Sequence, residues 1–144
     1  MPTRFGPAPP DETEILRAFF AGNPFLVSGP PKWNTLGLGA TAMFASTLVY
    51  NTRRTGEIIL DGRRYLLRRV LFPENAPPEY FVIDLLQQHD MAGMSLSELE
   101  LGLVATLNDD RWNQDALVDM AKTYGSKATL ALVERAIRDT SKTL

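Results

Sequence analysis

Apolar side chains recur at helical spacing near the start of the chain. Asp11 opens the first such stretch, residues 11–20, which has acidic residues in its first turn and is followed by the stop signal Gly22-Asn23-Pro24. The apolar stripe of this stretch consists of Ile15, Leu16, Phe19 and Phe20. We therefore expect an amphipathic helix that begins at Asp11 and ends before Gly22.

After Pro73 the apolar spacing is helical to the end of the chain. Ser97 and Glu100 have the spacing of a capping box, which marks the start of a helix. Gly125 followed by Ser126 indicates a boundary between two helices, with Gly125 as the C-cap of the first and Ser126 as the N-cap of the second. The four helices expected here fall within residues 77–90, 95–107, 109–125 and 126–142.

The middle of the chain favours strands. "STLVYNTRR" (46–54) is rich in β-branched and aromatic residues, and Asp61-Gly62 between two apolar runs predicts a two-residue type I′ turn. Such a turn pairs Leu60 with Arg63 and Ile59 with Arg64. Alternation then gives a core face of Ile58, Leu60, Tyr65, Leu67 and Leu71, and an opposite face with Arg64, Arg68, Glu57, Ile59, Leu66 and Val70.

Strands and helices are segregated along the chain, which predicts an α+β fold. "FLVS" (25–28) is a candidate buried strand, and residues 29–39 predict a turn with a single helical turn. We expect short strands and a β-hairpin in a small mixed sheet packed against about five helices, with an all-helical C-terminal half. The 144 residues are expected to form one domain: an extended lead-in (1–10), a helix plus sheet (11–76) and a helical part (77–144).

Composition adds few constraints. With 44% apolar and 22% charged residues the chain has the composition of a globular protein. The absence of cysteine excludes disulfides and thiolate sites. No apolar run approaches the roughly 20 residues of a membrane span, and the first residues lack the apolar core of a signal peptide. We expect a soluble cytoplasmic protein with no membrane partner.

Positive charge is concentrated in one stretch. All six basic residues of the window 53–69 are arginine, which gives this window a net charge of +4, while the remaining residues carry −6. Arginine is planar and always ionised, so it suits phosphates or carboxylates. The predicted contact residues for nucleic acid or an acidic partner are Arg53, Arg54, Arg64, Arg68 and Arg69. The alternative is a solvated sheet face with a salt-bridge ladder to Glu57.

The sequence offers little support for catalysis. His89 is the single histidine and has no nucleophile motif around it, so we interpret it as a solvated or capping residue. "GLGAT" (37–41) lacks the complete phosphate-loop patterns. We expect no catalytic residues, no metal site and no cofactor. Asp84, which lies between apolar residues in "FVIDLL", is interpreted as one partner of an ion pair with a hairpin arginine.

Two other functions remain as alternatives. The first is a metal-dependent nuclease, active or degenerate, with Glu57, Asp61 and Asp84 as its acidic residues, although "YLLRR" stands where a Glu-x-Lys pair would be needed. The second is a helix-turn-helix nucleic-acid-binding protein formed by residues 116–137. The second helix of that pair has a nearly balanced set of charges, which favours a helical hairpin packed in the core.

Two segments, "PFLVSGPPKWNTLGLG" and "VYNTRRTGEIILDGRRYLLRR", carry a resemblance to a known family. Over roughly residues 5 to 140 the chain resembles the C-terminal domain of AbiEi-like antitoxins of type IV toxin–antitoxin systems. The helices at the end match that domain only in pattern. The N-terminal winged-helix domain of the family, which binds operator DNA, has no counterpart in this sequence.

The resemblance implies a non-enzymatic regulatory protein of an abortive-infection (phage-defence) system. Its partner would be a nucleotidyltransferase-like toxin, which type IV antitoxins counteract without a stable inhibitory complex. Operator recognition and autorepression are not expected, because they belong to the missing winged helix.

Overall fold

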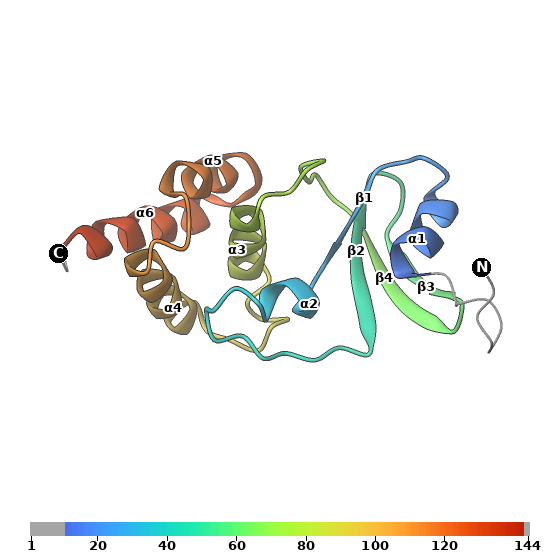
Figure 1. The fold of residues 1–144 in the computed structure, drawn as a ribbon, viewed down its shortest axis with the longest axis horizontal. Coiled ribbons are helices and arrows are strands. Elements are labelled where there is room, and N and C mark those ends of the chain that lie inside the picture. Colours follow the sequence, from blue (N-terminus) through green and yellow to red (C-terminus); the bar gives the residue numbers. More distant parts are fainter. Residues whose placement is uncertain (1–10, 143–144) are drawn as a thin grey trace, which may run out of the picture.

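The computed structural model of the protein describes residues 11–142, which form an α+β fold (Figure 1). The expected fold class is confirmed. The lead-in expected over residues 1–10 lies outside the described residues. In chain order the elements are α1 (Glu12–Phe20), β1 (Phe25–Ser28), α2 (Pro30–Trp33), β2 (Ser46–Asn51), β3 (Gly56–Leu60), β4 (Arg63–Arg69), α3 (Pro78–Gln87), α4 (Leu96–Asn108), α5 (Gln114–Tyr124) and α6 (Lys127–Lys142).

The four strands form one mixed sheet in the order β1-β2-β4-β3. β2 pairs with β1 in antiparallel and with β4 in parallel orientation, and β3 pairs only with β4. Strand β2 ends at Asn51, so the expectation that it extends to Arg53 and Arg54 is wrong. It also does not lie alongside β3, because β4 turns back from β3 and occupies the position next to β2.

The hairpin of β3 and β4 has the predicted register. Asp61 and Gly62 both have positive φ, 51° and 77°, as a type I′ turn requires. Leu60 pairs with Arg63 and Ile59 with Arg64, as expected. Strand β4 ends at Arg69, however, and one further hydrogen bond beyond it runs from the Val70 N–H to the Asn51 carbonyl. Leu71 therefore lies outside the sheet with 83% of its surface exposed, and its expected place in the core is wrong.

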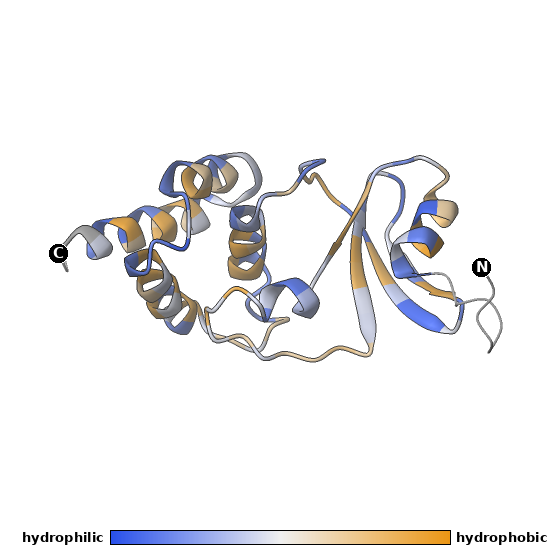
Figure 2. Ribbon diagram, viewed as in Figure 1, coloured by the Kyte–Doolittle hydropathy of each residue, from blue (hydrophilic) through white to orange (hydrophobic). Residues whose placement is uncertain are grey.

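The two faces of the sheet have different neighbours. α1 covers one face with Leu16 and Phe20, which pack against Val49, Tyr65 and Leu67. On the other face, Leu48 and Tyr50 of β2 join the larger core formed by α2 and the C-terminal helices. Figure 1 shows α1 and the helical part on opposite sides of the sheet. In Figure 2, hydrophobic residues concentrate on α3 and the middle of the strands, while the hairpin end of β4 is hydrophilic.

A local capping box fixes the start of α4. The capping box of α4 is formed by Ser95 and Glu98, whose side chain and backbone groups bond reciprocally, and not by Ser97 and Glu100 as expected. The sequence "SLSELE" contains the Ser-x-x-Glu spacing twice, and the helix uses the first copy since it begins at Leu96. Glu100 is bound instead to a distant arginine.

A second departure from expectation is the start of α5. This helix begins at Gln114, after an Asn113 N-cap whose side chain accepts a hydrogen bond from the Ala116 N–H. The sequence predicts a helical region that begins at Asp109. Asp110 has a positive φ of 54°, however, which interrupts a continuous helix there.

The long connection from α2 to β2 packs on α4 through a glycine. A Cβ atom at Gly102 would lie 2.6 Å from the Leu38 carbonyl oxygen, closer than any side chain could tolerate. Leu36, Leu38 and Ala40 of this connection are buried. Residues 37–41, considered above as a remote phosphate-loop candidate, are thus a packing segment between α2 and α4.

No helix within residues 11–142 is both long enough and apolar enough to cross a bilayer.

The turn at Gly62 gives a direct test of the hairpin. Gly62→Val should lower the free energy of unfolding by about 1–3 kcal/mol, because a β-branched residue is strained at positive φ. A steric clash does not contribute to this loss, since a Cβ at this position would have no atom within 4 Å. The measurement is the denaturation midpoint. Asp61→Asn is the matched control and should leave it unchanged, because asparagine tolerates the left-handed conformation.

Candidate functional site

The predicted contact arginines are organised by the buried side chain of Asn51. Its Oδ1 atom accepts hydrogen bonds from the backbone N–H groups of Arg53 and Arg54, both at 2.8 Å. Its Nδ2 group donates to the carbonyl oxygens of Arg54 at 3.0 Å and Arg68 at 3.3 Å. One amide side chain at the end of β2 thereby ties the turn after that strand to the neighbouring strand β4.

Thr55 adds a second tie between the same segments. Its hydroxyl oxygen accepts a hydrogen bond from the Arg69 N–H at 3.0 Å. The backbones of Arg53, Arg54, Arg68 and Arg69 are therefore held together at one end of the sheet, and we call these four residues the arginine cluster. Three of them are exposed, and the fourth, Arg68, is half-buried and donates to Gln88 Oε1 at 3.4 Å.

The arginine cluster borders the C-terminal end of α1. Arg53 and Arg54 line a hollow of about 280 Å³ together with Phe19, Phe20 and Asn23. The C-terminal end of a helix carries partial negative charge on its last carbonyl groups, so nearby guanidinium groups are favourable there. The cluster is thus both fixed by side-chain hydrogen bonds and compatible with its electrostatic surroundings.

Arg64, the fifth predicted contact residue, lies apart from the cluster. It shares a face of β4 with Arg68, as strand alternation predicts, but four residues of extended strand separate the two by roughly 13 Å. Its Nη1 atom lies 3.7 Å from Glu57 Oε1, and both side chains are more than half exposed. The structure therefore brings four of the five predicted contact residues together and leaves Arg64 at the hairpin end.

Charge is divided between the two parts of the fold. Residues 11–72 carry eight Arg or Lys against five Asp or Glu, a net charge of +3, whereas residues 73–142 carry six against twelve, a net charge of −6. The arginine cluster lies in the positive part. An anionic partner would be attracted to the sheet and repelled by the helices.

Asp84 is the most deeply buried carboxylate at the contact between sheet and helices, with 6% of its surface exposed. Its Oδ2 atom accepts hydrogen bonds from Ser28 Oγ at 2.5 Å and Trp33 Nε1 at 3.0 Å, and its Oδ1 atom accepts one from Tyr50 Oη at 2.5 Å. The expected ion pair with a hairpin arginine is wrong. Neutral donors hold this carboxylate, and Arg68, whose charge acts on Asp84 without forming an ion pair with it, is hydrogen-bonded to Gln88.

Burial determines the ionisation of this group. Desolvation raises the pKa of Asp84 above its ordinary value, although the hydrogen bonds from Ser28, Tyr50 and Trp33 oppose the shift. Burial and the neighbouring carboxylate also raise the pKa of the Tyr50 hydroxyl. Both oxygens of Asp84 are engaged with donors from the sheet half, so the geometry gives this residue the role of joining elements.

A small, partly open pocket of about 120 Å³ with a mixed polar and apolar lining lies beside Asp84. Its walls include Tyr50, Tyr80, Gln88 and Tyr124. Tyr80 and Tyr124 contact each other edge to face, with ring centroids 5.4 Å apart. The cavity marks the place where the sheet, α3 and α5 meet.

The other residues considered for catalysis have local structural roles. His89 Nδ1 lies 3.0 Å from the Met94 carbonyl oxygen and 3.5 Å from Asp90 Oδ1, in the connection between α3 and α4. Among residues 11–142 there is no group of three or more His, Cys, Asp or Glu side chains that could hold a metal ion. Glu57, Asp61 and Asp84, the acidic residues of the nuclease alternative, are thus not brought together.

The proposed helix-turn-helix corresponds to α5 and α6. Arg135 of α6 donates two hydrogen bonds to Glu100 of α4, from Nε at 2.8 Å and from Nη2 at 2.7 Å. The Arg135 hydrogen bonds lower the pKa of the Glu100 carboxyl. This arginine serves contact between helices, which gives no support to α6 as a recognition helix.

Comparisons with protein-family models, with curated proteins and with solved structures found no match to this chain. The functional interpretation therefore depends on the geometry and on the resemblance described above.

Two residues that position the arginines, Asn51 and Thr55, were not recognised from the sequence. The available signal was local: an asparagine at the end of an apolar strand, followed by the polar run "TRRTG", is typical of an Asx turn. What this pattern could not indicate is the long-range bond from Asn51 to Arg68.

The raised pKa of Asp84 predicts a pH-dependent contribution to stability. Since the folded pKa lies above the unfolded one, the folded protein binds the proton more tightly, and the contribution to the free energy of unfolding is present at low pH and lost as pH rises through the folded pKa. Denaturant unfolding of the parent and of Asp84→Asn across this range should show the parent losing stability relative to the variant as pH rises. Asp61→Asn, which removes an exposed carboxylate, is the control; a parent–variant difference that stays constant would contradict the assignment.

Asn51 gives a test of how the arginine cluster is held. Asn51→Ala should lower the free energy of unfolding by about 1–3 kcal/mol, because it leaves backbone groups of Arg53, Arg54 and Arg68 without their partner. Thermal or denaturant unfolding measures this loss. Asn34→Ala, which removes a single exposed hydrogen bond to the Ala42 carbonyl, is the control and should cost less. Equal losses in the two variants would contradict the organising role of Asn51.

Proposed function

We propose that this protein is an antitoxin-like, non-catalytic regulatory domain of a type IV toxin–antitoxin system. In this role it counteracts a nucleotidyltransferase-like toxin, and the arginine cluster is its contact surface for an anionic partner. The sequence resemblance supports the class of protein. One observation supports the contact surface: Asn51 and Thr55 hold the backbones of four arginines at one end of the sheet.

The arrangement of the cluster suits binding of phosphate or carboxylate groups. Arginine presents several N–H donors in a planar fork and keeps its charge at any physiological pH. Because hydrogen bonds fix the backbone beneath the side chains, less conformational freedom is lost when a partner binds. Arg53, Arg54 and Arg69 are exposed and therefore accessible to a partner.

Long-range electrostatics would orient the partner. The sheet part has a net charge of +3 and the helical part −6, so a polyanion approaches the sheet end. Such binding should weaken with salt, since counterions are released from a nucleic acid when arginines replace them.

The deciding experiment is rescue of cells that express the cognate nucleotidyltransferase-like toxin, whose gene the proposal expects in the neighbouring reading frame. The parent protein should restore growth, and Arg53→Ala/Arg54→Ala/Arg69→Ala should not. The matched control is Lys122→Ala/Lys127→Ala/Arg138→Ala, which removes the same number of positive charges from exposed positions of the helical part and should rescue fully. Circular dichroism establishes that both variants fold.

Binding assays identify the chemistry of the partner. If the partner is nucleic acid, affinity for duplex DNA or RNA should fall with salt at a log–log slope of about −2 to −3 for three phosphate contacts, and the triple arginine variant should lose this dependence. Full rescue by the arginine variant would contradict the contact surface, and failure of the parent to rescue would contradict the antitoxin role. Cleavage of the nucleic acid in the presence of magnesium would contradict a non-catalytic function.

A further inference from the structure

Two neighbouring hollows lie where the chain turns from α1 into β1. The first, of about 280 Å³, is the hollow that Arg53 and Arg54 line. The second, of about 480 Å³, lies between that turn and the connection from β4 to α3, and its lining includes Phe25 and Phe72. Asn23 lines both hollows, so the two adjoin each other at this end of the sheet.

Phenylalanine side chains line both hollows. Phe19 and Phe20 belong to the first, and Phe25 and Phe72 belong to the second. Phe19 meets Phe20 edge to face with ring centroids 5.0 Å apart, and Phe20 stacks on Phe25 at 5.2 Å. Phe19, Phe25 and Phe72 are half-buried, which leaves part of each side chain accessible from its hollow. We call the two hollows with these four rings the aromatic track.

The lining of the aromatic track has a positive net charge. Arg53 and Arg54 of the first hollow and Arg17 of the second stand against one carboxylate, Glu74, which gives a net charge of +2. All three arginines are exposed, and none of them forms an ion pair within residues 11–142. Their charge is therefore available to an anionic ligand that enters the hollows.

Aromatic rings between arginines match the chemistry of a nucleic-acid strand. Any base can stack on an aromatic side chain, and guanidinium groups bind the phosphates that link the bases. Asn23 adds a polar group for a base edge: its Nδ2 group donates to the Phe20 carbonyl at 2.7 Å, and its Oδ1 atom has no partner in the described part of the chain. An acidic peptide would bind the arginines, but its carboxylates would leave the phenylalanine rings uncovered.

We propose that the aromatic track and the arginine cluster together bind single-stranded nucleic acid. Bases occupy the two hollows against Phe19 and Phe72, while Arg53 and Arg54 bind the phosphates beside them. The strand is single because the bases of a duplex are stacked on one another and cannot reach the rings. Such a site rests on the proposed contact role of the arginine cluster and gives its anionic partner a chemical class.

The probes are fluorescein-labelled oligodeoxythymidine, oligouridine, an abasic strand of the same length and a duplex of the same length. Fluorescence anisotropy should show that the parent binds one of the two single strands about tenfold more tightly than the abasic strand or the duplex. Phe72→Leu, which keeps an apolar side chain but removes the ring, should weaken binding of that strand about five- to tenfold and leave the abasic strand unaffected. Phe72→Trp should restore the affinity. Arg53→Ala/Arg54→Ala should weaken binding of every strand and lower its salt dependence.

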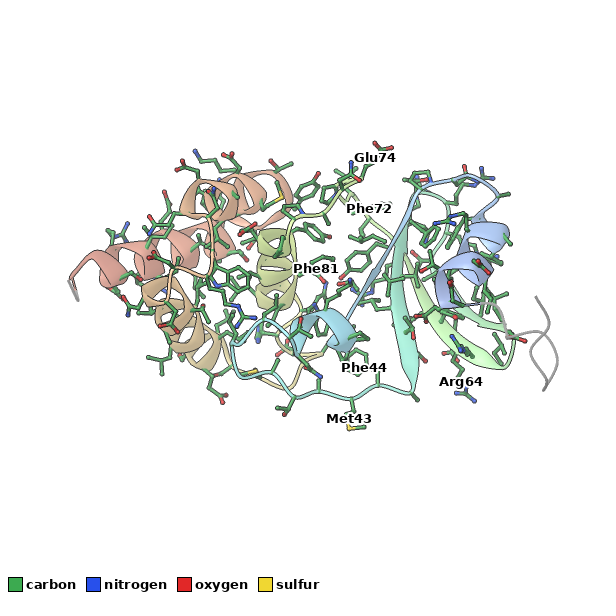
Figure 3. The ribbon with its side chains drawn as sticks, viewed as in Figure 1. Met43, Phe44, Arg64, Phe72, Glu74 and Phe81 are labelled. Carbon is green, nitrogen blue, oxygen red and sulfur yellow. The ribbon has the colours of Figure 1, made fainter. Side chains whose placement is uncertain are left out.

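The chain provides matched controls for these variants. Phe44 is also half-buried but lines neither hollow, and Figure 3 shows it on the opposite side of the molecule from Phe72, so Phe44→Leu should bind as the parent does. Arg63→Ala/Arg64→Ala removes two exposed charges from the hairpin end and should weaken binding less than the double variant of the cluster. Glu74→Gln removes the one carboxylate of the track and should tighten binding about twofold. The denaturation midpoint establishes that each variant folds.

Equal affinity of the parent for single strands, abasic strand and duplex would overturn the proposal and leave the arginine cluster as a contact surface for any polyanion. Equal weakening by Phe44→Leu and Phe72→Leu would also overturn it. Polyglutamate that binds more tightly than either single strand would identify an acidic protein as the partner instead. These measurements are independent of the rescue of cells, which tests the antitoxin role by itself.

Discussion

The packing of sheet against helices depends on one buried carboxylate. Asp84 of α3 accepts hydrogen bonds from Ser28 of β1, Trp33 of α2 and Tyr50 of β2, so donors from three elements of the sheet part converge on one acceptor in the helical part. Removing a carboxylate from water is costly, and these hydrogen bonds offset that cost only in one arrangement of the four elements. The apolar core around them is less selective, since hydrophobic contact has no direction. We infer that Asp84 fixes how the two parts fit together.

This arrangement leaves part of one sheet face open. α1 packs against residues of all four strands on its side, whereas the contacts of Asp84 draw α2 and α3 toward β1 and β2 on the other side. The inner strand β4 and the edge strand β3 are consequently less covered on that side, and Leu66, Ile59 and Arg64 stay accessible to different degrees. The incomplete cover of this sheet face is thus a consequence of where α3 is anchored.

The second determinant of the surface is Asn51. Its four hydrogen bonds end β2, turn the chain toward β3 and bring Arg53 and Arg54 beside Arg68. Like charges would otherwise favour separation of these segments. The sheet end therefore gathers positive charge while the helical part carries the acidic excess, and a partner can distinguish the two ends by electrostatics alone.

The sequence by itself determined the features that depend on a few neighbouring residues. The Asp61-Gly62 turn and the hairpin register follow from backbone sterics, and the common face of Arg64 and Arg68 follows from strand alternation. Tertiary structure alone decided the parallel pairing of β2 with β4, the choice of Ser95 over Ser97 as the cap, the exposure of Leu71 and the neutral donors around Asp84. Two of these involve a partner far away along the chain: Glu100 binds Arg135, and Asp84 accepts a hydrogen bond from Ser28, 56 residues earlier. Local patterns carry no information about which distant residue a side chain will contact. The residues of the arginine cluster could therefore be predicted from the sequence, but their arrangement in space could not.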